Sequence, residues 1–158
     1  MVGVPNRHLK DDISIVLGGE AGQGVQSMEH VLTRVLKRAG YHVFGTKEYM
    51  SRVRGGSNST QIRVSSSRVA AFVDRIDILI PLDRDAVTHL ERRISRDTIV
   101  LGECEKLAAP CPAVDVPFSK IATEVGSALY ANTVAVGVVL GLLKVRPEVL
   151  DVLSLIHI

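Results

Sequence analysis

The stretch Asp12–Gly40, DISIVLGGEAGQGVQSMEHVLTRVLKRAG, predicts a strand, a glycine-rich turn and a helix in one unbroken unit. Its apolar run Ile13–Leu17, interrupted only by a serine, is typical of a strand covered on both faces, as in a parallel sheet. We expect Gly18 and Gly19 to end this strand. From Val25 onward, apolar residues recur at three- and four-residue steps, which predicts an amphipathic helix that stops at Gly40.

The turn between strand and helix contains four glycines within seven residues: Gly18, Gly19, Gly22 and Gly24. Glycine lets the backbone take positive φ and lets a ligand approach the amides closely. Amides at a helix N-terminus favour phosphate or carboxylate. The spacing only approximates the dinucleotide fingerprint, because Ala21 replaces its middle glycine. Two interpretations stay open, an anion-binding loop and a tight turn that needs glycine for packing alone.

A second distinctive stretch follows at residues 48–65. Arg52 and Arg54 stand immediately before Gly55-Gly56, and a polar run that includes Asn58 comes next. Guanidinium groups bind phosphate or carboxylate through paired hydrogen bonds, so two of them beside a flexible diglycine suit an anion clamp. A solvated loop with outward-facing arginines is the alternative.

The remaining pattern predicts an α/β fold, Rossmann-like and doubly wound, with a mainly parallel sheet and an antiparallel hairpin. The hairpin is expected between Gln61–Val64 and Arg68–Val73. Further strands are expected at residues 41–44, 76–82, 98–101 and 113–116, and further helices at residues 84–94 after Asp83, 119–129 after a Ser119 cap, 132–144 after an Asn132 cap and 148–153 after Pro147. We expect a flexible N-terminal arm at residues 1–11, one domain at residues 12–146, and a C-terminal helix or truncated linker at residues 147–158.

Composition narrows the classes of protein. A chain of 158 residues has the size of one domain, and its net charge of +2 is too small to indicate a nucleic-acid partner, although basic residues cluster at 52–68 and 84–96. Two cysteines, Cys104 and Cys111, are too few for a metal site and are expected to be reduced thiols. The apolar segment Thr133–Leu143 is too short to span a bilayer. We expect a cytoplasmic protein without a membrane partner, a bound metal or a catalytic motif of its own.

Two ordered motifs together resemble a known family. Gly19–Val25, followed by Glu48–Asn58 and the strand Gln61–Ser65, is similar to the gamma domain of the 2-oxoacid:ferredoxin (acceptor) oxidoreductases of the pyruvate, 2-oxoglutarate and ketoisovalerate type. The resemblance continues through Asp77–Ile80 and Asn132–Gly137, covering about residues 12–145.

The resemblance implies one part of a multisubunit enzyme. In that family, thiamine diphosphate with magnesium attacks the 2-oxoacid in partner subunits, electrons pass through iron–sulfur clusters to ferredoxin, and coenzyme A accepts the acyl group. The expected partners are the alpha and beta subunits, and a delta subunit in those complexes that contain one. This chain contains neither a Gly-Asp-Gly diphosphate motif nor a cysteine cluster, so it is not catalytically complete alone. The resemblance links this domain with coenzyme A, and our hypothesis assigns the contacts to the glycine turn and the arginine stretch, the latter also being a candidate for the subunit interface. These residues are Gly19, Gly22, Gln23, Gly24, Arg52, Arg54, Gly55, Gly56 and Asn58.

Two other classes remain as alternatives. A Rossmann-type nucleotide-binding regulatory domain would bind NAD, but Gly45 and Thr46 occupy the place where an acidic residue would hold the ribose. A structural interaction module would use the same glycines for turns and the same arginines for a partner's carboxylates. The sequence does not identify the 2-oxoacid.

Overall fold

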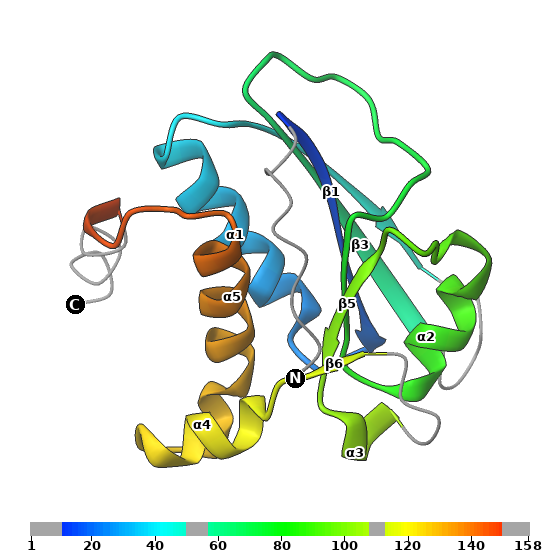
Figure 1. Ribbon diagram of the computed structural model, residues 1–158, viewed down its shortest axis with the longest axis vertical. Helices are drawn as coiled ribbons and strands as arrows, with labels where there is room; N and C mark the ends of the chain where they lie inside the picture. The colour runs from blue at the N-terminus through cyan, green and yellow to red at the C-terminus, as the bar shows by residue number, and fades with distance from the viewer. Residues whose placement is uncertain (1–10, 50–56, 108–112, 150–158) are drawn as a thin grey trace.

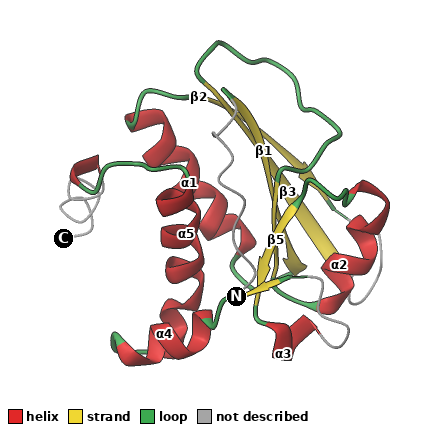
Figure 2. Cartoon of the chain, in the orientation of Figure 1, coloured by secondary structure: helices red, strands yellow, loops and turns green. Residues whose placement is uncertain are grey.

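The computed structural model describes residues 11–49, 57–107 and 113–149 and contains a six-stranded sheet in the order β2-β3-β1-β4-β5-β6. The strands are β1 (Asp12–Glu20), β2 (His42–Glu48), β3 (Ser57–Ser65), β4 (Ile78–Pro81), β5 (Ile99–Gly102) and β6 (Val114–Asp115). Pairing is parallel from β1 to β6 and antiparallel on the β2-β3-β1 side. The predicted α/β fold with a mainly parallel sheet is confirmed (Figure 2).

Helices cover both faces of this sheet. The helices α1 (Val25–Arg38), α4 (Phe118–Glu124) and α5 (Ala131–Leu142) contribute to the larger core, with α1 and α5 side by side (Figure 1). On the opposite face, α2 (Arg84–Leu90) packs Leu90 into a smaller core. The short elements are η1 (Glu91–Arg93), α3 (Cys104–Leu107) and η2 (Ala128–Tyr130).

The central strand β1 serves both cores, as its apolar run predicts. Ile15 and Leu17 point into the larger core and Val16 into the smaller one, because successive side chains of a strand alternate between faces. All three are fully buried. A strand with this pattern can only lie inside a sheet that is covered on both sides.

The helix α1 forms where the apolar periodicity predicts it. Met28, Leu32 and Val35 are buried against the sheet, and Gly24 before the helix and Gly40 after it both have positive φ, at 87° and 92°. These two positions require the freedom of glycine, since other residues are strained there.

The predicted end of the first strand is wrong. Gly18 and Gly19 do not terminate β1 but continue it to Glu20, paired with Ser59 and Asn58 of β3. A Cβ on Gly18 would lie 2.8 Å from the Ala86 Cβ of α2. The glycine therefore lets α2 lie close against the end of the strand.

The sheet has the predicted antiparallel part, but the pair of strands expected to form it is wrong. The strand β3 begins at Ser57, inside the expected polar loop, and pairs with β1 on one side and β2 on the other. Residues 68–73 form no strand. The polar side chains of β3 suggest an exposed segment, but the strand is buried and Gln61 is hydrogen-bonded inside the protein. Gln61 donates to Ser14 Oγ at 2.8 Å and to the Val73 carbonyl.

An ion-pair network lies at the start of β1 and the end of β3. The Arg63 guanidinium donates two hydrogen bonds to the Asp12 carboxylate, at 2.8 and 2.9 Å, and a third to the Ala71 carbonyl. Arg75 adds ion pairs to Asp12 and Asp77. The hydrogen bonds from Arg63 hold the pKa of Asp12 below its ordinary value. These arginines fasten the irregular 66–77 segment to the sheet.

The last helices begin at different residues from those expected. Ser119 does not cap α4, which starts at Phe118 after Pro117, and the helix ends at Glu124 rather than at residue 129 because Gly126 turns the chain with a φ of 142°. Asn132 lies inside α5, so it is not the cap either. The expected N-terminal arm and the greater part of the helix after Pro147 lie outside the described residues.

Two other expectations concern cysteine and the membrane. Cys104 is disulfide-bonded, so the expectation of a reduced thiol is wrong at that position, while Cys111 lies outside the described residues. None of the helices in the described ranges combines the length and the apolar character needed to cross a bilayer.

The contact between Gly18 and Ala86 makes a testable prediction. Gly18→Ala should lower the free energy of unfolding by about 2 kcal/mol, because the added methyl group overpacks the strand against α2. Ala86→Gly costs about 1 kcal/mol alone through helix propensity but makes room for that methyl group. Urea unfolding of both single variants and the double variant should give a favourable coupling energy of about 1 kcal/mol or more. Strict additivity would contradict this packing account.

Candidate functional site

The loop that follows β1 lies between two cavities. The first, here called the strand-end cavity, has a volume of about 290 Å³. It lies where β1, β4 and β5 end, and its lining includes Gln23, Leu82, Glu103, Lys106 and Asn132. The chain leaves β1 and β4 toward helices on opposite faces of the sheet. Crevices at such a point, outside the carboxyl ends of the strands, are the usual ligand sites of open α/β sheets.

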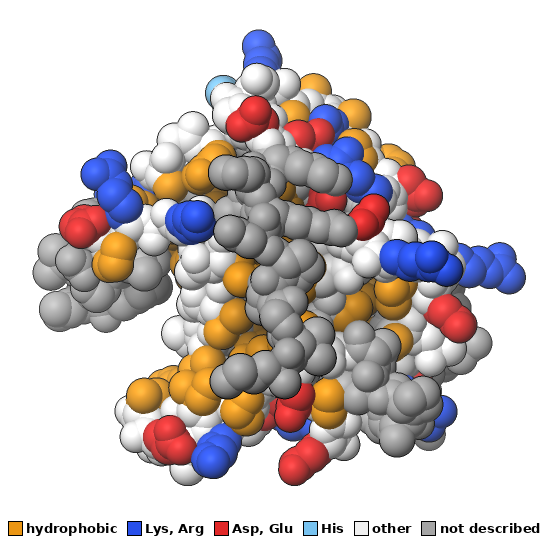
Figure 3. All heavy atoms as spheres, viewed as in Figure 1, with side chains coloured by type: hydrophobic (Ala, Val, Ile, Leu, Met, Phe, Trp, Pro, Cys, Tyr) orange, Lys and Arg blue, Asp and Glu red, His pale blue; other side chains and the backbone are white. Residues whose placement is uncertain are grey.

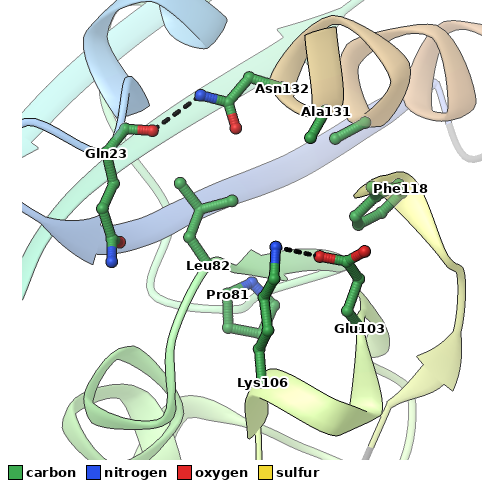
Figure 4. A pocket seen from close by; sticks show the side chains of 9 residues that line it. Gln23, Pro81, Leu82, Glu103, Lys106, Phe118, Ala131 and Asn132 are labelled. Carbon is green, nitrogen blue, oxygen red and sulfur yellow. Dashed lines mark hydrogen bonds and ion pairs between the residues drawn. The ribbon is translucent and has the colours of Figure 1, made fainter. Parts of the chain in front are cut away.

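A long-range hydrogen bond forms one wall of the strand-end cavity. The Asn132 side chain, near the start of α5, donates to the Gln23 carbonyl at 2.7 Å (Figure 4). The amide reaches this carbonyl only because position 24 is glycine, since a Cβ there would lie 2.3 Å from Asn132 Nδ2. The bond therefore ties the glycine loop to α5, 109 residues further along the chain.

The opposite wall carries a charged cluster of Glu103, Lys106 and Ser119. Glu103 accepts hydrogen bonds from the Ser119 N–H at 2.6 Å and the Ser119 hydroxyl at 3.0 Å, and it pairs with the Lys106 ammonium (Figure 4). Burial opposes ionisation of Glu103, but Lys106 and Ser119 together hold its pKa below the ordinary value. The carboxylate is thus ionised and bound to its neighbours, which makes it a poor general base.

The second cavity, here called the helix-start cavity, lies on the other side of the loop and has a volume of about 320 Å³. Its lining includes Gly22, Gly24, the first residues of α1, Tyr49 and Asn58. Gly22 has a φ of 93°, and a Cβ added there would meet no atom within 4 Å. The backbone at Gly22 is therefore open to a ligand.

The first turn of α1 carries an uncompensated positive end. Gly24 provides no side-chain cap, and the turn contains no acidic residue. By contrast, α2 is capped by Asp83, whose carboxylate accepts from the Ala86 N–H at 2.8 Å, and Asp85 lies in its first turn. Since Val25, Gln26 and Ser27 line the helix-start cavity, this end of α1 suits an anionic group.

The structure brings some of the predicted site residues together and separates others. Gly22, Gly24 and Asn58 meet at the helix-start cavity. Gln23 faces the strand-end cavity instead, and its Oε1 accepts from the Glu20 N–H at 2.9 Å.

Gly19 belongs to β1, and a Cβ there would lie 2.5 Å from Gln23 Oε1, so the missing side chain leaves room for the Gln23 amide. Arg52, Arg54, Gly55 and Gly56 lie outside the described residues.

Sequence reasoning missed most of the strand-end cavity. Glu103 follows β5 directly at the carboxyl edge of the sheet, which is a signal that could have drawn attention to it. Lys106 and Asn132 give no such signal, because their roles depend on contacts made only in the fold.

Comparison with known proteins gives a consistent result. A family model described as pyruvate ferredoxin/flavodoxin oxidoreductase matches residues 14–153. A 2-oxoacid:ferredoxin oxidoreductase subunit alpha from Sulfolobus is 32% identical over 48% of this chain, which spans only 12% of that relative's length. The 2-oxoglutarate synthase subunit KorC of Archaeoglobus fulgidus is 27% identical over 89% of this chain and 76% of its own length.

A solved structure has the same fold. The 2-oxoglutarate:ferredoxin oxidoreductase from Magnetococcus marinus, with 2-oxoglutarate, coenzyme A and succinyl-CoA bound, matches with a TM-score of 0.77 and 25% identity. The match covers 89% of this chain and 26% of that one.

The charged cluster makes a testable prediction. Because the folded pKa of Glu103 is lowered, its stabilising contribution is fully present above the unfolded pKa and is lost as pH falls through the folded value. Glu103→Gln should lower the free energy of unfolding by about 1 kcal/mol at pH 7, and the difference from wild type should shrink steadily below about pH 4. Urea unfolding of both proteins at pH 7 and at a pH below about 4 measures this difference in the free energy of unfolding. Glu105→Gln, at an exposed neighbour, is the matched control and should have little effect at either pH.

Proposed function

The chain belongs to the pyruvate ferredoxin/flavodoxin oxidoreductase family as a gamma-type domain, and from that premise we propose that it works within a 2-oxoacid:ferredoxin oxidoreductase complex that converts a 2-oxoacid to its acyl-CoA. Within this complex it contributes subunit contacts and part of the coenzyme A site. Its partners are the alpha and beta subunits, with a delta subunit in some forms, and ferredoxin receives the electrons. The decarboxylation and electron-transfer chemistry is supplied by thiamine diphosphate with magnesium and by iron–sulfur clusters in those partners.

The observation that carries the coenzyme A assignment is the uncapped start of α1, open to the helix-start cavity beside Gly22. Coenzyme A carries a pyrophosphate and a 3′-phosphate, and free backbone N–H groups at a helix start bind such oxygens. The Asn58 amide lines the same cavity and offers a further donor. Tyr49, also on the lining, is 62% exposed and presents a ring on which an adenine base can stack.

Arg52 and Arg54 complete this proposal from the sequence alone. They belong to the seven residues that connect Tyr49 to Ser57. Tyr49 lines the helix-start cavity, and Ser57 is the first residue of β3. Guanidinium groups close to that cavity would bind a phosphate with paired hydrogen bonds. In the bound state this domain therefore holds and orients the phosphate end of coenzyme A and takes no part in bond making.

A purely structural role has one observation in its favour. Both Gly19 and Gly24 leave room for side chains of this domain, since a Cβ there would lie 2.5 Å from Gln23 Oε1 and 2.3 Å from Asn132 Nδ2. That role predicts tight assembly without any effect of this domain on coenzyme A binding. The two candidate functions therefore differ in whether variants of this domain change the KM for coenzyme A.

The complex can be tested first without any variant. The tagged chain, purified from its native host without oxygen, should retain thiamine diphosphate and iron and should reduce a viologen dye when a 2-oxoacid and coenzyme A are added. A panel of 2-oxoacids on the same sample then identifies the substrate. Recovery of the chain alone, with no cofactor or with NAD bound, would contradict the proposed function.

The coenzyme A contact is tested in the same purified complex. Arg52→Ala with Arg54→Ala should raise the KM for coenzyme A at least tenfold, because each lost charge-assisted hydrogen bond costs about 1.4 kcal/mol or more. The KM for the 2-oxoacid should not change. Arg92→Ala with Arg96→Ala removes two exposed arginines elsewhere and is the matched control. An unchanged KM for coenzyme A in the first pair would favour the structural role.

A further inference from the structure

The outer face of α5 has a composition unusual for a surface helix. Its twelve residues, ANTVAVGVVLGL, contain no charged side chain, and its inner residues Ala135, Val136, Val139 and Leu140 are buried. The outer positions, one turn apart, are Thr133, Gly137 and Gly141, and all three are exposed. Surface helices normally carry a polar outer face, and a helix that is apolar all round is normally buried.

Within the part of the chain that the structure describes, no neighbouring atom explains the two outer glycines. Glycine lowers helix stability relative to alanine, so a helix interior keeps it only where something else is gained. Among the residues of 11–49, 57–107 and 113–149, a Cβ added at Gly137 or Gly141 would meet no atom within 4 Å outside the neighbouring turns of α5. The missing side chains therefore leave room for something that approaches α5 from outside.

Exposed apolar side chains continue this face at the start of α5. Val125 is 67% exposed, Leu129 89% and Tyr130 51%, so three of the seven large hydrophobic side chains exposed within the described ranges lie in six consecutive positions. Figure 3 shows hydrophobic side chains gathered over α4 and the adjoining end of α5. Apolar patches of this kind mark protein–protein contacts.

We propose that this surface, formed by Val125, Leu129, Tyr130 and the Thr133–Gly137–Gly141 stripe, is where the rest of the oxidoreductase packs an uncharged helix against α5. The proposal rests on the proposed function and names the surface through which this domain joins its partner. Close approach of two helices needs small residues at the crossing, and the stripe supplies them on this side. A charge on the facing helix would be buried without a partner, so the contacting face is apolar.

The lengths of the relatives support the rest of the oxidoreductase as the occupant. This chain matches 26% of the Magnetococcus marinus chain and 12% of the Sulfolobus alpha subunit, but 76% of KorC. The same domain thus occurs both joined to a much longer chain and as most of a separate subunit. A domain that is used in both ways needs a surface that fits the remainder of the enzyme, and in the longer relatives that remainder is part of the same polypeptide. With 12 residues, α5 is shorter than the about 20 apolar residues that a helix needs to span a bilayer.

The test measures the Tm of the chain and its assembly with the partner subunits. If the glycines served only the fold of this chain, both quantities would change in the same direction. Gly137→Gln with Gly141→Gln should raise the Tm of the isolated chain by about 2–4 °C or more, because glutamine favours a helix over glycine. The same double variant should retain at least tenfold less of the thiamine diphosphate, iron and partner subunits after anaerobic purification from the native host. The control is Thr88→Gln, at an exposed position of α2 on the opposite side of the sheet from α5. This variant should purify with the full complex.

A photo-crosslinker identifies the neighbour directly. With p-benzoylphenylalanine in place of Leu129 and both α5 glycines unchanged, we expect a crosslink to the larger oxidoreductase subunit. A crosslink to a second copy of this chain, or a double variant that keeps the full complex, would overturn the proposal. Wild-type chain that carries neither cofactor nor 2-oxoacid-dependent activity would instead contradict the proposed function, so the two failures are distinguishable.

Discussion

The absence of side chains at Gly18 and Gly19 is the constraint on which the site depends. On one face of β1, α2 approaches so closely that a methyl group at Gly18 would reach the Ala86 Cβ at 2.8 Å. On the other, Gln23 and Leu82 fill the space in which a Gly19 side chain would lie. The strand can therefore extend to Glu20 with neighbours pressed against both faces. The loop that begins there is held in the one place from which it separates the two cavities.

The parallel half of the molecule could be predicted from the sequence because its signals are local. The apolar run of β1, the periodicity of α1 and the cap at Asp83 each depend on residues a few positions apart. Pattern reasoning fails at β3, because Ile62 and Val64 line one buried face of this strand while the other buried face is polar. The Gln61 side chain donates to Ser14 Oγ on the neighbouring strand, and Arg93 donates to Gln61 Oε1 at 2.8 Å, so polarity there does not indicate exposure. No local pattern can report a hydrogen bond between partners 47 residues apart.

The candidate site divides in the same way. The glycine loop and the start of α1 were visible as an anion-binding pattern, and Gly22, Gly24 and Asn58 do meet. Gly19 shows where such reasoning stops, because a glycine that leaves room for neighbouring side chains and one that lets a ligand approach look the same in a sequence. Asn132 was expected to cap a helix, since asparagine near a helix start usually does. Its amide instead crosses to the Gln23 carbonyl, which only the packing of α5 beside the loop makes possible.

The Glu20 N–H at the end of β1 has two acceptors rather than one. It donates to Gln23 Oε1 at 2.9 Å and to Asp83 Oδ2 at 3.0 Å, the latter from the same carboxylate that caps α2. Loss of either acceptor leaves the other in place, so the N–H stays paired. Such redundancy gives the chain mutational tolerance at position 23: the loop can exchange its glutamine, and with it the chemistry that this side chain presents to the strand-end cavity, without losing its anchor to the sheet.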